Sequence, residues 1–533
     1  MTAQQLPLET LLHIFSFLSS ESLASFASVC RSWQIAVEKI TFADIHLNLS
    51  TLKRLGDIVR SSGFERCELI KRIHFKVNLP EYSVAARGSY ENSYDHKRNN
   101  EMFTLSISSL LETLSFWPST GNNSTSLELY SRSPSDWRAC EDWAERRTRH
   151  QTAIAFPEEE LLDKRWEGSY LDLTERIPFT AGCIHSFKIP GHPGYRHFAP
   201  SAISEIVSLL PQVEKVDMVL HDDEKNDSVL RDRLRGGKPS SSSRSPLQLS
   251  FQYSIFCSSL GEPLNTFRAV KSNDASIGLN FKGWPQSLRC LDLSYPGPTP
   301  SDDETLDPPP RSASGKDILS LALHKLSHQL KSITLRNIMI GPELFWPAIA
   351  NQCIPMWPNL TTFVMDYQPA TTSGKWLFEN DPAWDEKVDE PWSPSETPIS
   401  PGRFRTLPNA KLDELYCAAA QAAQRMPRLR CMRLEAGIGR SWIKESFGPP
   451  VHTFEYNAIR GQAIWTSSSE YHLAGHVRSA WDAVAKSHGH AEVYSESVWF
   501  YYCPEDASEY SGANILDDRW RKKYGCFSWD DDS

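Results

Sequence analysis

One feature limits the possible folds of this chain more than any other: a helix-like run, a proline and a short strand-like run recur in that order. Each proline stands two residues before an apolar position, and the three are Pro211, Pro358 and Pro427. The helix-like runs before them are residues 201–210, 342–353 and 412–426; a fourth, 317–330, leads straight into its strand-like run. Because proline ends a helix, this order predicts repeated helix–turn–strand units, the layout of an α/β solenoid.

The strand-like runs share three apolar positions: a leading one and two more that follow three and five residues later. The clearest copies are Val213/Val216/Met218, Leu288/Leu291/Leu293, Leu330/Ile333/Leu335, Leu360/Phe363/Met365 and Leu429/Met432/Leu434. Weaker copies are Ile70/Ile73/Phe75, Leu111/Leu114/Phe116, Ile184/Phe187/Ile189, Leu264/Phe267/Ala269 and Val451/Phe454/Tyr456. Such a pattern also arises by chance in a chain with 40% hydrophobic residues, so the pattern alone does not identify a strand. The copies that directly follow a helix-like run are the ones that support repeated units.

The units resemble leucine-rich repeats, although their spacing is irregular and no asparagine ladder is present. The resemblance implies an irregular leucine-rich-repeat-like α/β solenoid with long loop insertions. An α/β domain of another topology remains the alternative. The polar or Pro/Ser-rich insertions are residues 80–100, 221–250, 296–316 and 369–409, the last containing Trp376, Trp384 and Trp392. Their composition is typical of linkers, and the tryptophans could instead cover the array or contact a substrate.

The N-terminal segment, residues 6–42, predicts three short amphipathic helices. Pro7 suits a first helical position and Glu9 the first turn. The apolar stripes at helical spacing are Leu8/Leu11/Leu12/Phe15/Leu18, Leu23/Phe26/Ala27/Cys30 and Trp33/Ala36/Val37/Ile40. A bundle this small cannot bury all of its apolar side chains, among them Ile14 and Phe17, so the segment predicts a partner surface.

The order and spacing of these residues resemble the F-box motif over residues 5–45. The residues that carry the resemblance, and that it assigns to adaptor binding, are Leu6, Pro7, Glu9, Leu12, Ile14, Phe15, Leu18, Leu23, Val29, Cys30 and Trp33. The resemblance implies binding to a Skp-type adaptor and, through it, to cullin and RING subunits. The alternative is that the three helices are core elements of a larger domain, and Leu11, Phe26 and Ala27 fit either role.

Composition argues against several other partners and compartments. The net charge of −10 disfavours nucleic acid, and no apolar run is long enough to predict a membrane span or a signal peptide. The 11 cysteines form no CxxC pair, which favours a reducing compartment, and hence the cytoplasm or nucleus.

A catalytic site has weak support. His452, His472, His476, His488 and His490 lie close in sequence, with Cys503 nearby, and a pair spaced i, i+4 could hold a metal on one helical face. No HExxH motif, phosphate-binding loop, dinucleotide-binding glycine triplet or nucleophile elbow accompanies them. We therefore expect no catalytic residue, no metal and no cofactor.

Together these observations predict five regions. They are an F-box at 1–45, a first part of the array at 46–220, a linker at 221–250, a second part at 251–460, and a C-terminal α/β capping unit with an acidic tail at 461–533. The arrangement is similar to that of fungal F-box proteins with a long, Trp-rich region. It predicts a non-catalytic substrate-recognition subunit of a ubiquitin ligase, which would hold an unidentified protein substrate. The alternatives are an F-box scaffold outside any ligase and an enzyme with a C-terminal metal site.

Overall fold

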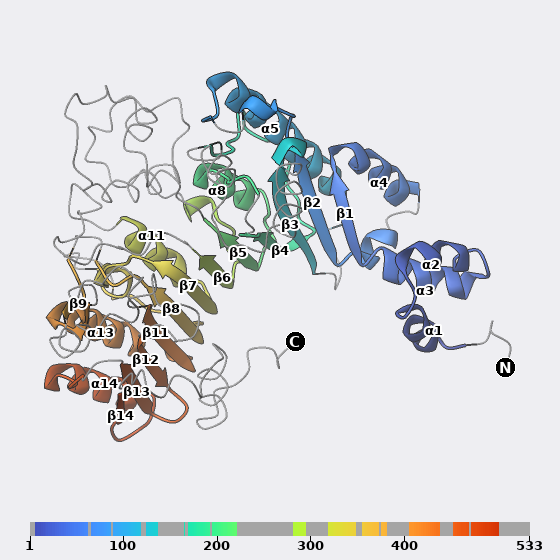
Figure 1. Ribbon diagram of the computed structural model, residues 1–533. Helices are drawn as coiled ribbons and strands as arrows, with labels where there is room; N and C mark the ends of the chain where they lie inside the picture. The colour runs from blue at the N-terminus through green and yellow to red at the C-terminus, as the bar shows by residue number, and fades with distance from the viewer. Residues whose placement is uncertain are drawn as a thin grey trace, which may run out of the picture. The chain divides into compact units, whose positions relative to one another are not determined.

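The structure is a computed structural model (Figure 1). It describes residues 6–61, 65–86, 89–118, 124–136, 165, 169–191, 195–220, 281–294, 318–347, 354–371, 375–380, 405–437, 451–467 and 471–499. These fall into two compact units, the first containing the described residues up to 294 and the second those from 318 onward. The expected regions 221–250 and 296–316, the weak copy Leu264/Phe267/Ala269 and the tail after residue 499 lie outside the described residues.

The first unit begins with three short helices, as the sequence predicts. They are α1 (Leu8–Phe15), α2 (Ser20–Phe26) and α3 (Arg31–Thr41). Pro7 stands directly before α1 with an extended backbone. A small core holds the helices together, formed by the buried side chains of Leu11, Phe15, Leu23, Ala36 and Val37.

A sheet of six parallel strands follows, and its spatial order is the order of the chain. The strands are β1 (Asp44–Asn48), β2 (Arg72–Asn78), β3 (Thr125–Arg132), β4 (Ile184–Ile189), β5 (Lys215–Val219) and β6 (Cys290–Ser294). Each pairs in parallel with the next. Parallel neighbours require a crossover connection, and helices supply several of these.

The crossover helices cover one face of this sheet. They are α4 (Leu49–Ser61), α5 (Ser93–Ser115) and α8 (Pro200–Ser208), with single turns η2 (Glu65–Leu69), η3 (Val84–Ala86) and η5 (Phe281–Gly283). In Figure 1 the three α-helices lie on the same side of the strands. Alternate strand residues such as Ile73, Phe75 and Val77 are fully buried beneath them. The residues between, such as His74 and Lys76, lie on the other face and are half-buried.

One backbone contact repeats along the array. The residue before a strand donates its N–H to the carbonyl of the equivalent residue one strand earlier. Examples in the first unit are Lys71 to Ala43, Glu214 to His185 and Arg289 to Glu214, and in the second unit Thr361 to Lys331 and Arg430 to Thr361. Several neighbouring strands are therefore joined at the same point.

The second unit has a mixed sheet of six strands. They are β7 (Ser332–Ile338), β8 (Thr362–Tyr367), β11 (Cys431–Gly437), β12 (Val451–Asn457), β13 (Gln462–Ser467) and β14 (Tyr494–Trp499). The pairs β7–β8, β8–β11 and β13–β14 are parallel, whereas β11–β12 and β12–β13 are antiparallel. A separate two-stranded ladder joins β9 (Phe378–Asn380) to β10 (Arg405–Pro408).

Helices also cover one face in the second unit. They are α11 (Ile318–Ser327), α13 (Ala410–Ala423) and α14 (Gly475–Ser487), with the single turn η6 (Pro342–Leu344). Helices α13 and α14 pack against each other beside the sheet (Figure 1). Helix α14 buries Val477, Trp481 and Val484.

The structure corrects three predictions about single elements. Leu111, Leu114 and Phe116 are not a strand, because the first two lie in the long helix α5 and Phe116 caps its end. The expected insertion at 80–100 includes the first two turns of α5, capped by the Asn92 side chain. The helix expected at 342–353 is a single turn in its described part.

The remaining differences concern the direction of one strand, β12, and the burial of one side chain, Trp376. Strand β12 was counted as a weak copy of the repeat, yet it runs antiparallel to β11 and forms a hairpin with β13. Trp376 is 5% exposed. It therefore packs into the second unit and does not project into solvent, where it could contact a substrate. Trp384 and Trp392 lie outside the described residues.

Candidate adaptor-binding surface

The interior of the three-helix domain is built around aromatic rings. Phe15 stacks on Phe26 at 5.7 Å between ring centroids and meets Trp33 edge-on at 5.2 Å. Phe15 is 1% exposed and Leu23 2%. Helices this short are marginal alone, so this shared core is what holds α1, α2 and α3 in place.

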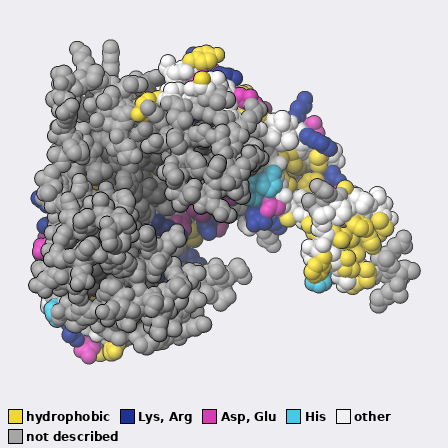
Figure 2. Space-filling model, in the orientation of Figure 1, with side chains coloured by type: hydrophobic (Ala, Val, Ile, Leu, Met, Phe, Trp, Pro, Cys, Tyr) yellow, Lys and Arg dark blue, Asp and Glu magenta, His cyan; other side chains and the backbone are white. Residues whose placement is uncertain are grey.

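Large apolar side chains remain on the outside of the same domain. Ile14 is 43% exposed, Phe17 76% and Val29 51%, and Pro7 is exposed as well. Ile14 and Phe17 belong to α1 and its end, three residues apart, and Val29 lies between α2 and α3. Figure 2 shows hydrophobic side chains gathered over these helices. We call Pro7, Ile14, Phe17 and Val29 the apolar surface.

The residues that the motif assigned to adaptor contact therefore divide into three groups. Pro7, Glu9, Ile14 and Val29 are exposed. Leu6, Leu12, Leu18, Cys30 and Trp33 are half-buried. Phe15 and Leu23 are core residues of the domain itself. Phe17 is not among the motif residues, but it lies outside the apolar stripe Leu8/Leu11/Leu12/Phe15/Leu18, and that position is the sequence signal that marks it as a surface residue.

The three-helix domain is attached firmly to the sheet. Only Phe42 and Ala43 separate α3 from β1. The Arg66 guanidinium forms an ion pair with Glu38 of α3 at 2.7 Å and lies 5.7 Å from the centroid of the Phe42 ring. Burial alone would raise the pKa of Glu38, but the hydrogen bonds from Arg66 and Gln34 lower it overall, so Glu38 holds Arg66 as a carboxylate.

A buried ionic network lies at the carboxyl ends of β2 and β3, in the segment expected to be a linker. Arg196 pairs with Glu91, and their side chains are 1% and 3% exposed. Arg165 pairs with Asp95 at 2.7 Å and lies over the ring of Tyr82 at 4.6 Å. Arg196 also lies 4.0 Å from the buried carboxylate of Asp136. Each guanidinium therefore has at least one carboxylate partner, and the network offers no unpaired positive charge to an anionic ligand.

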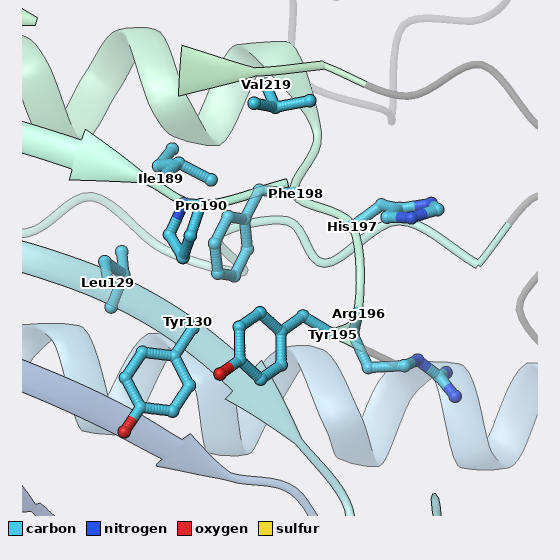
Figure 3. A pocket seen from close by; sticks show the side chains of 9 residues that line it. All are labelled: Leu129, Tyr130, Ile189, Pro190, Tyr195, Arg196, His197, Phe198 and Val219. Carbon is cyan, nitrogen blue, oxygen red and sulfur yellow. The ribbon is translucent and has the colours of Figure 1, made fainter. Parts of the chain in front are cut away.

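A pocket opens beside this network (Figure 3). Tyr130 and Tyr195 stack at 4.8 Å on one side of it, and Leu129, Ile189 and Phe198 line the rest. The enclosed space has room for little more than one water molecule. That is too small for a metabolite or cofactor.

The C-terminal histidines do not form a joint site. His472 and His476 are the pair spaced i, i+4, but His472 precedes α14, so the two do not share a helical face, and both are exposed. His488 Nε2 contacts the Met426 carbonyl at 3.1 Å, and His490 Nε2 contacts that of Ala458 at 2.8 Å. His452 is fully buried, which lowers its pKa to about 3. Cys503 lies outside the described residues.

Comparison with known families agrees with this geometry at the N-terminus. Residues 3–43 match the model of the F-box-like family. The chain thus contains an F-box-like domain, and by that domain it is an F-box protein. Such a domain indicates a role in binding an adaptor of the Skp type, as in subunits of Skp–cullin–F-box ligases.

A second match covers the end of the chain. Residues 404–509 match a family of unknown function, DUF6546, and the described part of that segment runs from β10 through β14. No curated protein was found to match the sequence. In the described part of the chain, no helix combines the length and the hydropathy that crossing a bilayer requires.

Proposed function

We propose that this protein is a substrate-recognition subunit of a Skp–cullin–F-box ubiquitin ligase. The observation that carries the proposal is the F-box-like domain with its exposed apolar surface. Burying Ile14, Phe17 and Val29 against an adaptor would remove their side chains from water, worth about 1–3 kcal/mol for each fully buried side chain. The adaptor would bring the cullin and RING subunits, in the cytoplasm or nucleus.

The rest of the protein would hold the substrate, as an irregular leucine-rich-repeat-like array. Two features support this. The six parallel strands of the first unit follow chain order, and the same backbone contact joins one repeat to the next in both units. Long insertions between repeats account for the irregular spacing.

The open face of the first sheet is the part best suited to a protein substrate. The side opposite the described helices carries one row of polar residues, one from each strand in register: His46, His74, Glu128, Lys188, Asp217 and Asp292. The row carries charges of both signs, with Lys188 between Glu128 and the two aspartates. A polar face on a rigid scaffold is typical of a surface that selects a partner by charge.

The chemistry would be done by other subunits. The contribution of this chain is to raise the effective concentration of the substrate near the ubiquitin-loaded enzyme and to orient it. In that role it needs no catalytic residue of its own.

The test is co-purification of the full chain with a Skp-type adaptor. The double variant Ile14→Asp/Val29→Asp places two charges in the apolar surface and should abolish the complex. Both side chains are about half exposed, so the change should leave the far-UV circular dichroism intact. The matched control is Leu105→Asp, on the solvent side of α5 at 52% exposure, which should bind the adaptor as wild type does.

The proposal fails if wild-type chain does not bind the adaptor, or if the double variant binds as tightly as the Leu105→Asp control. A positive result would be extended by recovering the cullin from the wild-type complex and testing for its loss in the double variant.

A further inference from the structure

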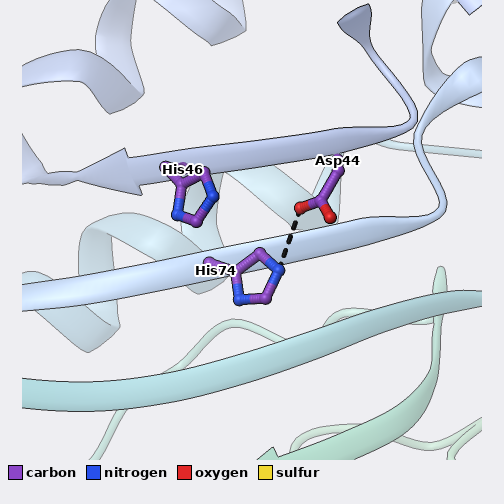
Figure 4. A group of neighbouring side chains, drawn as sticks. All are labelled: Asp44, His46 and His74. Carbon is purple, nitrogen blue, oxygen red and sulfur yellow. Dashed lines mark ion pairs between the residues drawn. The ribbon is translucent and has the colours of Figure 1, made fainter. Parts of the chain in front are cut away.

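Two histidines and an aspartate meet where the F-box-like domain joins the sheet (Figure 4). Asp44 and His46 are two residues apart on β1, so their side chains leave the same face. His74 lies directly opposite His46 on β2. All three occupy the face of the sheet opposite the described helices α4, α5 and α8.

The three side chains turn their ligand atoms toward one another. One ligand atom from each lies within 4.8 Å of the other two. The imidazoles of His46 and His74 are nearly parallel, with ring centroids 4.6 Å apart. Oδ1 of Asp44 lies 2.9 Å from Nε2 of His74, as the dashed line in Figure 4 marks.

Asp44 is oriented as a one-oxygen ligand. Its Oδ2 is held by the Arg72 guanidinium at 2.6 Å. Its Oδ1 is shielded from water and has no hydrogen-bond donor with good geometry among the described residues, although Nε2 of His74 is close. A buried carboxylate oxygen without a donor is costly, and a cation between it and the imidazoles would satisfy it.

His74 is oriented from its other side. Its Nδ1 faces Oε1 of Glu128 on β3 at 3.7 Å, an electrostatic contact longer than a hydrogen bond. A carboxylate on this side of a histidine, the usual outer partner of a metal ligand, favours a proton on the near nitrogen and leaves the second nitrogen to bind the ion. Nε2 of His74, the atom nearest Asp44, is then the ligand atom.

We propose that Asp44, His46 and His74 bind one divalent transition-metal ion, with zinc as the best match. Two imidazole nitrogens and one carboxylate oxygen are a common three-ligand set for zinc, whereas magnesium and calcium take oxygen ligands. Zinc–ligand bonds of about 2.0–2.1 Å bring neighbouring ligand atoms to about 3.3 Å. His46 is exposed and can close that gap by rotating its side chain.

The site would have two consequences. The ion joins β1, the first strand of the sheet, to β2, and β1 carries the F-box-like domain two residues before its start. Three protein ligands also leave a fourth position for water or for a side chain of a bound protein. The sequence predicts no metal, and the candidate ligands that it brings together are the C-terminal histidines alone, far from β1 and β2.

The experiment uses the metal-free full-length chain, titrated with Zn²⁺ by calorimetry and with Co²⁺ by absorbance. Wild type should bind one ion with a dissociation constant in the micromolar range or below. The exposed ligand is the one to remove: His46→Gln should weaken this binding by about 100-fold or more, because losing a ligand costs at least as much as losing an outer partner. The matched control, His472→Gln/His476→Gln, removes two exposed histidines of the second unit and should bind as wild type does.

The Co²⁺ spectrum separates this site from the 11 cysteines of the chain. Nitrogen and oxygen ligands give weak visible bands only, whereas thiolate ligands add a strong near-ultraviolet band. The proposal is overturned if wild type binds neither ion, if the near-ultraviolet band appears with the first equivalent, or if His46→Gln binds as tightly as wild type. In that case the group is an ion pair between His74 and Asp44 beside a stacked histidine.

Discussion

Acid should destabilise the second unit, and the fully buried His452 should account for a measurable part of the loss. Burial also lowers the pKa values of His324, His328 and His488 in this unit, so a variant of His452 should remove only its own share. The His452 side chain lies in β12, fully buried among the rings of Phe378, Tyr416 and Tyr471 at centroid distances of 5.6, 5.9 and 5.1 Å. Neither ring nitrogen has a hydrogen-bond partner among the described residues. Burial lowers the pKa of this imidazole from 6.5 to about 3, because nothing around it stabilises a positive charge.

The magnitude follows from the difference between the folded and unfolded pKa values. Above pH 6.5 both states hold His452 neutral, so it adds no pH dependence. Between pH 6.5 and about 3 the unfolded chain binds one more proton than the folded chain, and the free energy of unfolding therefore falls as the pH falls. At pH 5, about 1.5 pH units below the unfolded value, the loss is about 2 kcal/mol.

The assay is urea unfolding of the full chain at pH 7 and pH 5, followed by circular dichroism. The variant His452→Phe keeps the ring and removes both nitrogens. At pH 7 it should be more stable than wild type by about 1 kcal/mol, because it removes buried polar atoms that lack partners. Between pH 7 and pH 5 it should lose about 2 kcal/mol less than wild type does.

The control is His476→Phe, which removes an exposed histidine of the same unit and leaves His452 in place. It should show the full wild-type loss between pH 7 and pH 5. Equal losses in wild type and His452→Phe would refute the reasoning, because the buried ring would then contribute nothing to the acid sensitivity.

Two further predictions concern the first unit. Arg196→Met leaves Glu91 as a buried charge without its guanidinium partner. We expect the free energy of unfolding to fall by about 3–5 kcal/mol in urea denaturation. A loss under about 1 kcal/mol, as for exposed pairs, would show that water reaches the network. Gly191→Ala places a methyl carbon 2.6 Å from the Val219 side chain, so it should lower the thermal unfolding midpoint. The control Gly283→Ala, whose new methyl carbon has its nearest neighbour at 3.5 Å, should leave the midpoint unchanged. Equal midpoints for the two variants would show that Val219 moves aside.

The sequence predicted elements well where the signal is local. Three amphipathic stripes define α1, α2 and α3, and a partnerless apolar residue such as Phe17 can be recognised from its place off the stripe. The same holds for the strands that follow a helix and a turn, since their three apolar positions are all buried, as with Leu330, Ile333 and Leu335. The same pattern gave a wrong prediction at Leu111, Leu114 and Phe116, which belong to helix α5 and its end and not to a strand. Apolar residues three apart also fit one side of a helix, so the pattern alone does not separate the two.

What the sequence could not supply was register between distant strands. Strands β1 and β3 were not predicted. β3 has Ser124 at the leading position of the pattern, whereas Phe42, Ile45 and Leu47 fit the pattern but follow α3 directly, without a helix–turn signal of their own. His46 and His74 therefore had no predicted common face, and their pairing appears only once β1 and β2 are aligned. The network of Glu91 and Arg196 likewise joins loops more than 100 residues apart, which looked polar and featureless in sequence.

The two-residue step from α3 into β1 sets how a ligase of the proposed kind could choose its target lysines. A flexible tether would let a bound substrate sweep a wide volume, and many lysines would then be accessible. Here the connection consists of Phe42 and Ala43 alone, which is too short to act as a flexible tether. The ion pair between Arg66 and Glu38 further restrains the angle between the F-box-like domain and the first sheet. A substrate seated on the first sheet would present the same few lysines at every encounter. Selection among them would then come from the bound pose, so a change of binding site on the array would also change the lysine that is modified.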